Sequence, residues 1–173
     1  MPKTGAKAAT PKASQSPKHA LSEGDAAPDF SLESDAGKRV TLGEFRGKTL
    51  VLYFYPKDST PGCTRQAQAF EVAKQKLAKR GAAVVGVSKD SLKSHCSFKE
   101  KYELSFPLLS DPDLAVQRAY GVYGEKMMYG KKIMGTIRST FVIDAKGKIA
   151  KVFSPVKVDG HADEVLAAVQ GST

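Results

Sequence analysis

The chain has 173 residues, of which 41% are hydrophobic and 26% charged, and its formal net charge is +9 at pH 7. This length and composition fit one ordinary globular domain with a sizeable core. Two cysteines are too few for a disulfide-stapled scaffold, and three scattered histidines without carboxylates at ligand spacing predict no metal site. The longest apolar run, residues 50–55, is far shorter than the roughly 20 residues that a membrane helix needs.

The beginning of the chain differs in composition from the rest. Residues 1–20 contain no acidic side chain, and their charged side chains are four lysines, Lys3, Lys7, Lys12 and Lys18. Such a segment cannot bury enough apolar surface to offset its conformational entropy, so we expect a disordered basic tail over residues 1–21 and a single domain over residues 22–173. The lysines could contact nucleic-acid phosphates weakly or serve only solubility, and both interpretations stay open. No apolar signal segment follows Met1, which predicts a cytoplasmic protein.

From residue 29 onward, short apolar strands alternate with amphipathic helices. We predict strands at residues 29–33, 39–42, 49–55, 82–87, 106–109, 140–143 and 148–153, and helices at residues 63–80, 91–103, 113–120 and 161–170. Turn sequences join the first two strands and the last two, which indicates two hairpins. The continuous apolar run in residues 49–55 is typical of a central strand buried on both faces. The fold class is therefore an α/β sandwich with a mixed central sheet, flanking helices and an N-terminal hairpin.

The reactive chemistry is concentrated where the strand at residues 49–55 meets the next helix. Cys63 lies in the first turn of that helix, where unpaired backbone N–H groups and the helix dipole stabilise an anion. A thiolate, the nucleophilic form of cysteine, is therefore favoured at this position. Thr60 carries a hydroxyl that can both donate and accept a hydrogen bond. From position alone, Cys63 is either a nucleophile or a buried structural cysteine.

The residues around Cys63 resemble the active-site motif of a known enzyme family. Residues 56–63, PKDSTPGC, match the P-x-x-x-T-x-x-C motif of the peroxiredoxins. Flanking segments resemble the Q-type branch, also called bacterioferritin-comigratory-protein-like, among them GVSKDS, FKEKY, FPLLSD, YGVYGEK and RSTFVID. The resemblance runs from about residue 28 to the C-terminal helix. It implies a thioredoxin-like fold and a thiol-dependent peroxidase that reduces hydrogen peroxide and organic hydroperoxides without a metal or bound cofactor.

The resemblance also implies roles for four residues. Cys63 would be the peroxidatic cysteine, and Thr60 would form a hydrogen bond with the peroxide. Pro56 would shield the sulfur from water. Arg138, at the start of the RSTFVID segment, would stabilise the thiolate and polarise the peroxide, a task that suits a permanently charged guanidinium with several donors. Position alone would favour a surface arginine at residue 138.

The second thiol departs from the commonest Q-type pattern. Many members carry a resolving cysteine five residues after the first, where this chain has Gln68. Some relatives place it on the later helix, so the resemblance makes Cys96 the candidate. An intramolecular Cys63–Cys96 disulfide would then form and be reduced by a thioredoxin-type dithiol. Because the two residues lie on different helices, local unwinding is expected before the sulfurs meet.

Three other interpretations stay open at this point. The protein could use one cysteine with an external thiol, or it could be a basic-tailed nucleic-acid-binding or chaperone-like protein on the same scaffold. A plain thiol–disulfide oxidoreductase is less favoured because the chain has no C-x-x-C motif at residue 63. We expect a monomer with a hydroperoxide substrate and no membrane contact. The aromatic and methionine cluster before Arg138 predicts a loop over the rim of the site, or core filling: Tyr120, Tyr123, Met127, Met128 and Tyr129.

Overall fold

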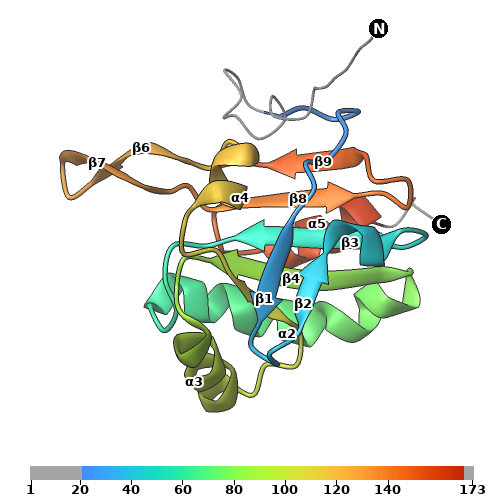
Figure 1. Cartoon of the computed structure of the whole chain (residues 1–173), viewed down its shortest axis with the longest axis horizontal. Helices are drawn as coiled ribbons and strands as arrows, with labels where there is room; N and C mark the ends of the chain where they lie inside the picture. Colours follow the sequence, from blue (N-terminus) through green and yellow to red (C-terminus); the bar gives the residue numbers. More distant parts are fainter. Residues whose placement is uncertain (1–20, 170–173) are drawn as a thin grey trace, which may run out of the picture.

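The computed structural model describes residues 21–169 (Figure 1). The expected disordered tail covers residues 1–21, of which residues 1–20 lie outside the described residues. Leu21, which the expected boundary places in the tail, packs in part against the core of the domain. The folded domain therefore includes Leu21.

A seven-stranded mixed sheet forms the centre of the domain. The strand order is β2-β1-β5-β4-β3-β8-β9, with the central strands β3, β4 and β5 parallel and the outer pairs antiparallel. The two predicted hairpins are β1–β2 and β8–β9, so these predictions are confirmed together with the mixed sheet. The bounds are β1 Ser31–Ser34, β2 Arg39–Thr41, β3 Thr49–Phe54, β4 Ala82–Ser88, β5 Leu108–Ser110, β8 Ser139–Ile143 and β9 Ile149–Phe153.

Strand β3 is the central strand that the apolar run predicts, and all six of its residues are buried. Successive side chains of a strand point to opposite faces of the sheet. Val51 and Tyr53 accordingly belong to the core on one face, and Leu52 and Phe54 to the core on the other. A strand buried on both faces must be apolar along its whole length, which explains the unbroken run in the sequence.

Helices cover both faces of the sheet. Helices α2 (Pro61–Lys79), α3 (Leu92–Tyr102) and α5 (His161–Val169) contribute to the core on the face of Tyr53. The short helix α4 (Ala115–Ala119) and the 3-10 helix η2 (Leu42–Phe45) contribute to the core on the opposite face. Figure 1 shows α2 and α5 side by side behind the sheet. The predicted sandwich is therefore confirmed.

The segment before Arg138 corrects one expectation. Instead of a loop it forms a two-stranded antiparallel hairpin, β6 (Tyr123–Met128) and β7 (Lys131–Thr136), which projects from the body of the domain (Figure 1). Tyr129 and Gly130 at its tip both have positive φ, as a tight hairpin turn with a right-handed twist requires. Tyr120 fills the core, whereas Met127 and Tyr129 are exposed, so the cluster divides between the two expected roles.

A testable prediction concerns Gly86 in β4, which lies under the ring of Tyr53. A Cβ atom at this position would lie 3.0 Å from Leu108 Cδ2 and from two ring atoms of Tyr53. We expect Gly86→Ala to lower the free energy of unfolding by about 1 to 3 kcal/mol, because the buried ring has to shift. Gly43→Ala, whose nearest neighbour would be 3.9 Å away, is the matched control. Urea unfolding of both variants measures the difference, and equal midpoints would contradict the packing argument.

Candidate active site

The loop after β3 places Cys63 at the start of a helix. Helix α2 begins at Pro61, and Cys63 is its third residue and only 1% exposed. The amides of Gly62 and Cys63 precede the first intrahelical hydrogen bond, in which Thr64 N–H donates to the Thr60 carbonyl oxygen at 2.8 Å. Thr60, the N-cap residue, does not cap these amides with its side chain. This end of α2 can therefore stabilise a negative charge next to the sulfur.

The hydroxyl of Thr60 is oriented by its own loop. Thr60 Oγ1 donates to the carbonyl oxygen of Lys57 at 2.9 Å. This bond uses the only hydroxyl hydrogen and leaves the oxygen free to accept from a ligand. Ser59, one of the two residues between Lys57 and Thr60, has φ of 65°, a left-handed conformation that a serine adopts only when its surroundings hold it there. The loop is thus a constrained segment with an acceptor turned outward.

Arg138 lies against the first turn of α2. It immediately precedes β8, which pairs with β3 and so brings residue 138 next to the loop that follows β3. Its Nη1 donates to Gln66 Oε1 at 2.7 Å. A Cβ atom at Gly62 would lie 3.2 Å from Arg138 Nη2, so the glycine allows the guanidinium to approach the backbone beside Cys63. The structure therefore brings together Cys63, Thr60 and Arg138.

Sequence analysis missed Gln66, the residue that holds the guanidinium. Gln66 is 1% exposed, and among the described residues its Nε2 has no hydrogen-bond partner. Burying an amide with an unpaired nitrogen costs free energy, so a buried glutamine of this kind needs an explanation. The hydrogen bond from Arg138 to the amide oxygen is part of that explanation. The feature of the sequence that could have identified Gln66 is its spacing. It lies three residues after Cys63, and residues three apart on a helix share one face.

A pocket of about 500 Å³ opens above this first turn of α2. Pro56, Thr60 and Arg138 line it, so all predicted site residues except the two cysteines form its wall. Among the described residues that line it, the other charged side chains are all cationic: Lys57, Lys89 and Lys126. Burial and the charge of Arg138 both lower the pKa of Lys126, with Cys63 acting in the opposite direction. The hairpin supplies an apolar side of the pocket through Tyr129, Ile133 and Met134.

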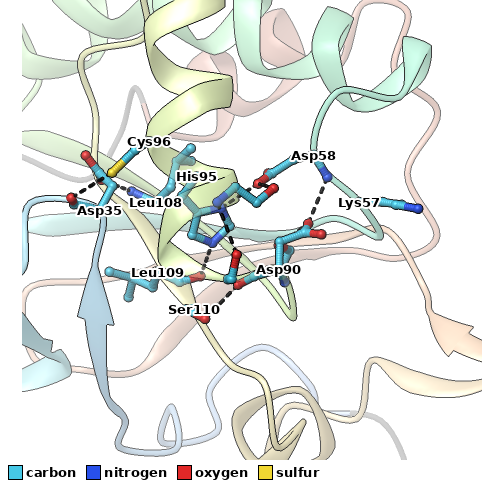
Figure 2. Close-up of polar contacts among 12 residues, drawn as sticks. Asp35, Lys57, Asp58, Asp90, His95, Cys96, Leu108, Leu109 and Ser110 are labelled. Atoms are coloured by element: carbon cyan, nitrogen blue, oxygen red, sulfur yellow. Dashed lines mark hydrogen bonds and ion pairs between the residues drawn. The ribbon is translucent and has the colours of Figure 1, made fainter.

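Cys96 lies elsewhere in the structure. It is exposed on α3, and its Sγ contacts the carbonyl oxygen of Asp35 at 3.3 Å (Figure 2). Lys99, one turn further along α3, forms an ion pair with the Asp35 carboxylate at 2.8 Å. Both cysteines are free thiols, and Cys63 is buried in the core cluster of α2. The structure therefore does not bring the two predicted redox cysteines together.

Within residues 21–169, no helix is long and apolar enough to span a membrane. No group of three or more His, Cys, Asp or Glu side chains among these residues is arranged to hold a metal ion.

Comparison with known proteins gives the same picture over most of the chain. Residues 23–152 match the model of the AhpC/TSA family. Peroxiredoxin Bcp of Escherichia coli is 45% identical over 146 residues, which is 84% of this chain and 94% of that protein. Peroxiredoxin Bcp of Bacillus subtilis is 44% identical over 147 residues, 85% of this chain and 94% of that protein. The chain belongs to the peroxiredoxin family.

Solved structures of family members agree with this fold. Peroxiredoxin Q of Xanthomonas campestris has a TM-score of 0.78 at 47% identity, covering 82% of this chain and 89% of that one. A Xylella fastidiosa homologue has a TM-score of 0.83 at 38% identity, covering 89% and 98%. The Xanthomonas campestris bacterioferritin comigratory protein was studied for alkyl peroxide reduction. It is 46% identical, with a TM-score of 0.78, and the match covers 82% of this chain and 90% of that one. The protein is a thiol-dependent peroxidase with a thioredoxin-like fold, which confirms the predicted family, fold and enzyme class.

A testable prediction for this peroxiredoxin concerns Gln66. Gln66→Leu removes the acceptor of Arg138 and also removes the unpaired amide nitrogen, so the fold should keep its stability. We expect the reaction with hydrogen peroxide to slow by about tenfold because the guanidinium loses its fixed position. Gln68→Leu, an exposed change on the same helix, is the control. Competition kinetics against a heme peroxidase measures both rates, and equal rates would show that Gln66 has no positioning role.

Proposed function

We propose that this peroxiredoxin reduces hydrogen peroxide and organic hydroperoxides with Cys63 as the peroxidatic residue and Cys96 as the resolving residue. The thiolate of Cys63 attacks the terminal peroxide oxygen, the O–O bond breaks, and the leaving hydroxide or alkoxide takes a proton to give water or an alcohol. Cys63 becomes a sulfenic acid. The Cys96 sulfur then attacks it, an S–S bond forms and water leaves. A thioredoxin-type dithiol reduces the disulfide and is itself oxidised.

The observation that supports this assignment most is the convergence on the first turn of α2. A buried sulfur follows two helix-terminal amides, and the Arg138 guanidinium lies against Gly62. These donors suit a reaction in which negative charge develops on both peroxide oxygens. In the proposed reaction, the oxygen of Thr60 accepts a hydrogen bond from the hydroperoxide O–H group. Pro56 lines the pocket, and its proposed role is to shield the sulfur from water.

The pairing of Cys63 with Cys96 requires movement. Cα atoms of a disulfide lie within about 7 Å of each other, and Cys96 is instead engaged with Asp35 on the outer side of α3. Cys96 is nevertheless the one other thiol in the sequence. We therefore infer that α3 leaves its place, at least in part, after Cys63 is oxidised. A one-cysteine cycle with an external thiol is the competing proposal.

The remaining partners are proposed from composition and chemistry. An intramolecular disulfide needs no second copy of the chain, so we propose a monomer in the cytoplasm. The four lysines of residues 1–20 could give weak, salt-sensitive contact with nucleic acid. This contact is independent of the peroxidase reaction, and removing the tail should leave peroxide kinetics unchanged.

A prediction that tests the proposal uses the two cysteine variants as mutual controls. Cys63→Ser should lose peroxide reduction, because a serine hydroxyl is neither ionised nor nucleophilic at neutral pH. Cys96→Ser should consume one equivalent of peroxide and then stall as a sulfenic acid. NADPH oxidation in a thioredoxin-coupled assay measures turnover. Substantial turnover by Cys63→Ser would refute the role of Cys63, and normal turnover by Cys96→Ser would favour the one-cysteine cycle.

A second prediction concerns the apolar side of the pocket. Met134 lines it, whereas Met127 lies on the same hairpin, similarly exposed, but does not line it. We expect Met134→Ser to lower kcat/KM for cumene hydroperoxide about three- to tenfold and to leave hydrogen peroxide unaffected, because only the organic substrate has an apolar group to bind. Met127→Ser should change neither value. Equal losses for both substrates would show that the hairpin does not contact the organic group.

A further inference from the structure

A buried ion pair joins the Cys63 loop to the helix of Cys96. His95 is fully buried, and its Nδ1 lies 2.8 Å from Asp58 Oδ2 (Figure 2). Two hydroxyls also donate to the Asp58 carboxylate, Tyr55 Oη at 2.6 Å and Ser94 Oγ at 2.7 Å. The Asp58 carboxylate therefore accepts from three side chains in a site almost without water.

The hydrogen bonds of His95 favour one protonation state of its ring. Its Nε2 lies 2.9 Å from the carbonyl oxygen of Leu109, which can only accept, so Nε2 carries a hydrogen. Nδ1 faces the carboxylate, which already accepts from two hydroxyls. Because the Asp58 carboxylate also accepts from two hydroxyls, the arrangement favours donation from both ring nitrogens, with an imidazolium at His95 and a carboxylate at Asp58.

The pKa directions agree with this assignment. Burial lowers the pKa of His95, but the hydrogen bond and charge of Asp58, the Leu109 carbonyl and the charge of Asp90 together raise it above its ordinary value. Burial raises the pKa of Asp58, but the bonds from His95, Tyr55 and Ser94 together lower it. The groups facing His95 are thus Asp58 from the Cys63 loop, Asp90 from the β4–α3 connection, Tyr55 after β3 and the Leu109 carbonyl of β5.

This ion pair connects the loop next to the peroxidatic Cys63 with the helix that carries the resolving Cys96. Asp58 immediately precedes the strained Ser59 and is two residues from Thr60, and its own N–H donates to Asp90 Oδ2 at 2.8 Å. His95 immediately precedes Cys96 on α3, with its ring on the side away from Asp35 (Figure 2). Any movement that frees Cys96 toward Cys63 by unwinding this part of α3 must therefore disturb the bonds to Asp58.

We propose that Asp58 and His95 form a latch between the Cys63 loop and α3, which positions the loop for the reaction with peroxide when closed and permits disulfide formation when open. This proposal rests on the proposed Cys63–Cys96 pairing. With the latch closed, Asp58 holds Ser59 and Thr60 in place while the Cys63 thiolate takes one oxygen from the peroxide. With the latch open, α3 unwinds, the Cys96 sulfur displaces hydroxide from the Cys63 sulfenic acid, and a proton from the Cys96 thiol completes the water.

The test measures the two steps separately in a single turnover. Competition against a heme peroxidase gives the rate of peroxide reaction, and acid quench, alkylation and mass analysis give the rate of Cys63–Cys96 disulfide formation. Ser94→Ala removes one donor to Asp58 without burying an unpaired charge. Ser97→Ala is the same change at an exposed position of α3. His95→Asn removes the positive charge of the pair. Its rates are compared with those of the wild type once urea unfolding has shown that the variant is folded.

We expect Ser94→Ala to form the disulfide about tenfold faster than Ser97→Ala, which is the effect of one hydrogen bond to a charged group on the opening equilibrium. Its peroxide reaction should be slower than that of the control. A simple loss of stability would slow the peroxide reaction without accelerating the disulfide step. Equal disulfide rates in the two serine variants would overturn the release function, and equal peroxide rates would overturn the positioning function.

The pH dependence supplies a second readout. The raised pKa of His95 means that its stabilisation is complete below its ordinary value of about 6.5 and disappears as the pH rises through the raised value. Disulfide formation should therefore accelerate with pH more steeply in the wild type than in His95→Asn, since thiol ionisation affects both equally. Parallel profiles would overturn the latch. If the wild type forms no Cys63–Cys96 bridge, the pairing and the release function fail together, whereas the peroxide rates still decide the positioning function.

Discussion

In the proposed reaction, the stabilisation of negative charge at one buried sulfur is the constraint on which the other features of the site depend. Cys63 is almost without solvent, so water cannot stabilise a thiolate or the oxygens of a reacting peroxide. The donors have to come from the protein, and the start of α2 supplies backbone amides and the helix dipole. Arg138 adds a full positive charge next to Gly62. The start of the helix without the arginine, or the arginine without the start of the helix, would supply only part of the positive electrostatic potential at Cys63.

The sheet topology brings these groups together. Strand β3 leads into α2, and β8 pairs with β3, so the residue before β8 lies beside the residues after β3. Residues more than seventy positions apart in the chain are thereby held together at the C-terminal end of β3. Because β3 is buried on both faces, this end of the strand is firmly held, as a preorganised site requires. Gln66 then orients the guanidinium from within α2.

The sequence is most informative where a structure is determined locally. The apolar run of β3, the turns of both sheet hairpins and the periodicity of α2 all depend on neighbouring residues, and these elements were predicted within a few positions. The β6–β7 hairpin was not, because its residues are largely exposed and show no alternation of apolar and polar side chains. Tertiary polar contacts were also missed. Asp58, Gln66 and His95 look like ordinary surface residues in the sequence, and only the fold shows that they are buried. Arg138 was identified by resemblance and not by position.

In the proposed cycle, the two thiols divide the chemistry between a rigid place and a movable one. Cys63 is buried in the core, whereas Cys96 is exposed on a helix that contributes Phe98 to the core and has polar contacts with Asp58 and Asp35. A peroxidase cycle of this kind requires both properties. The first sulfur must react in a defined field, and the second must be able to leave its place.

The role of Cys63 is tested most directly by peptide mass analysis of the reduced wild-type protein after one equivalent of hydrogen peroxide. Samples are taken at successive times, and dimedone is added to each one to trap the sulfenic acid that is still present. We expect dimedone adducts on Cys63 in the earliest samples, and fewer adducts together with a Cys63–Cys96 disulfide within one chain in the later samples. A dimedone adduct on Cys96, with Cys63 still open to alkylation, would contradict the role of Cys63.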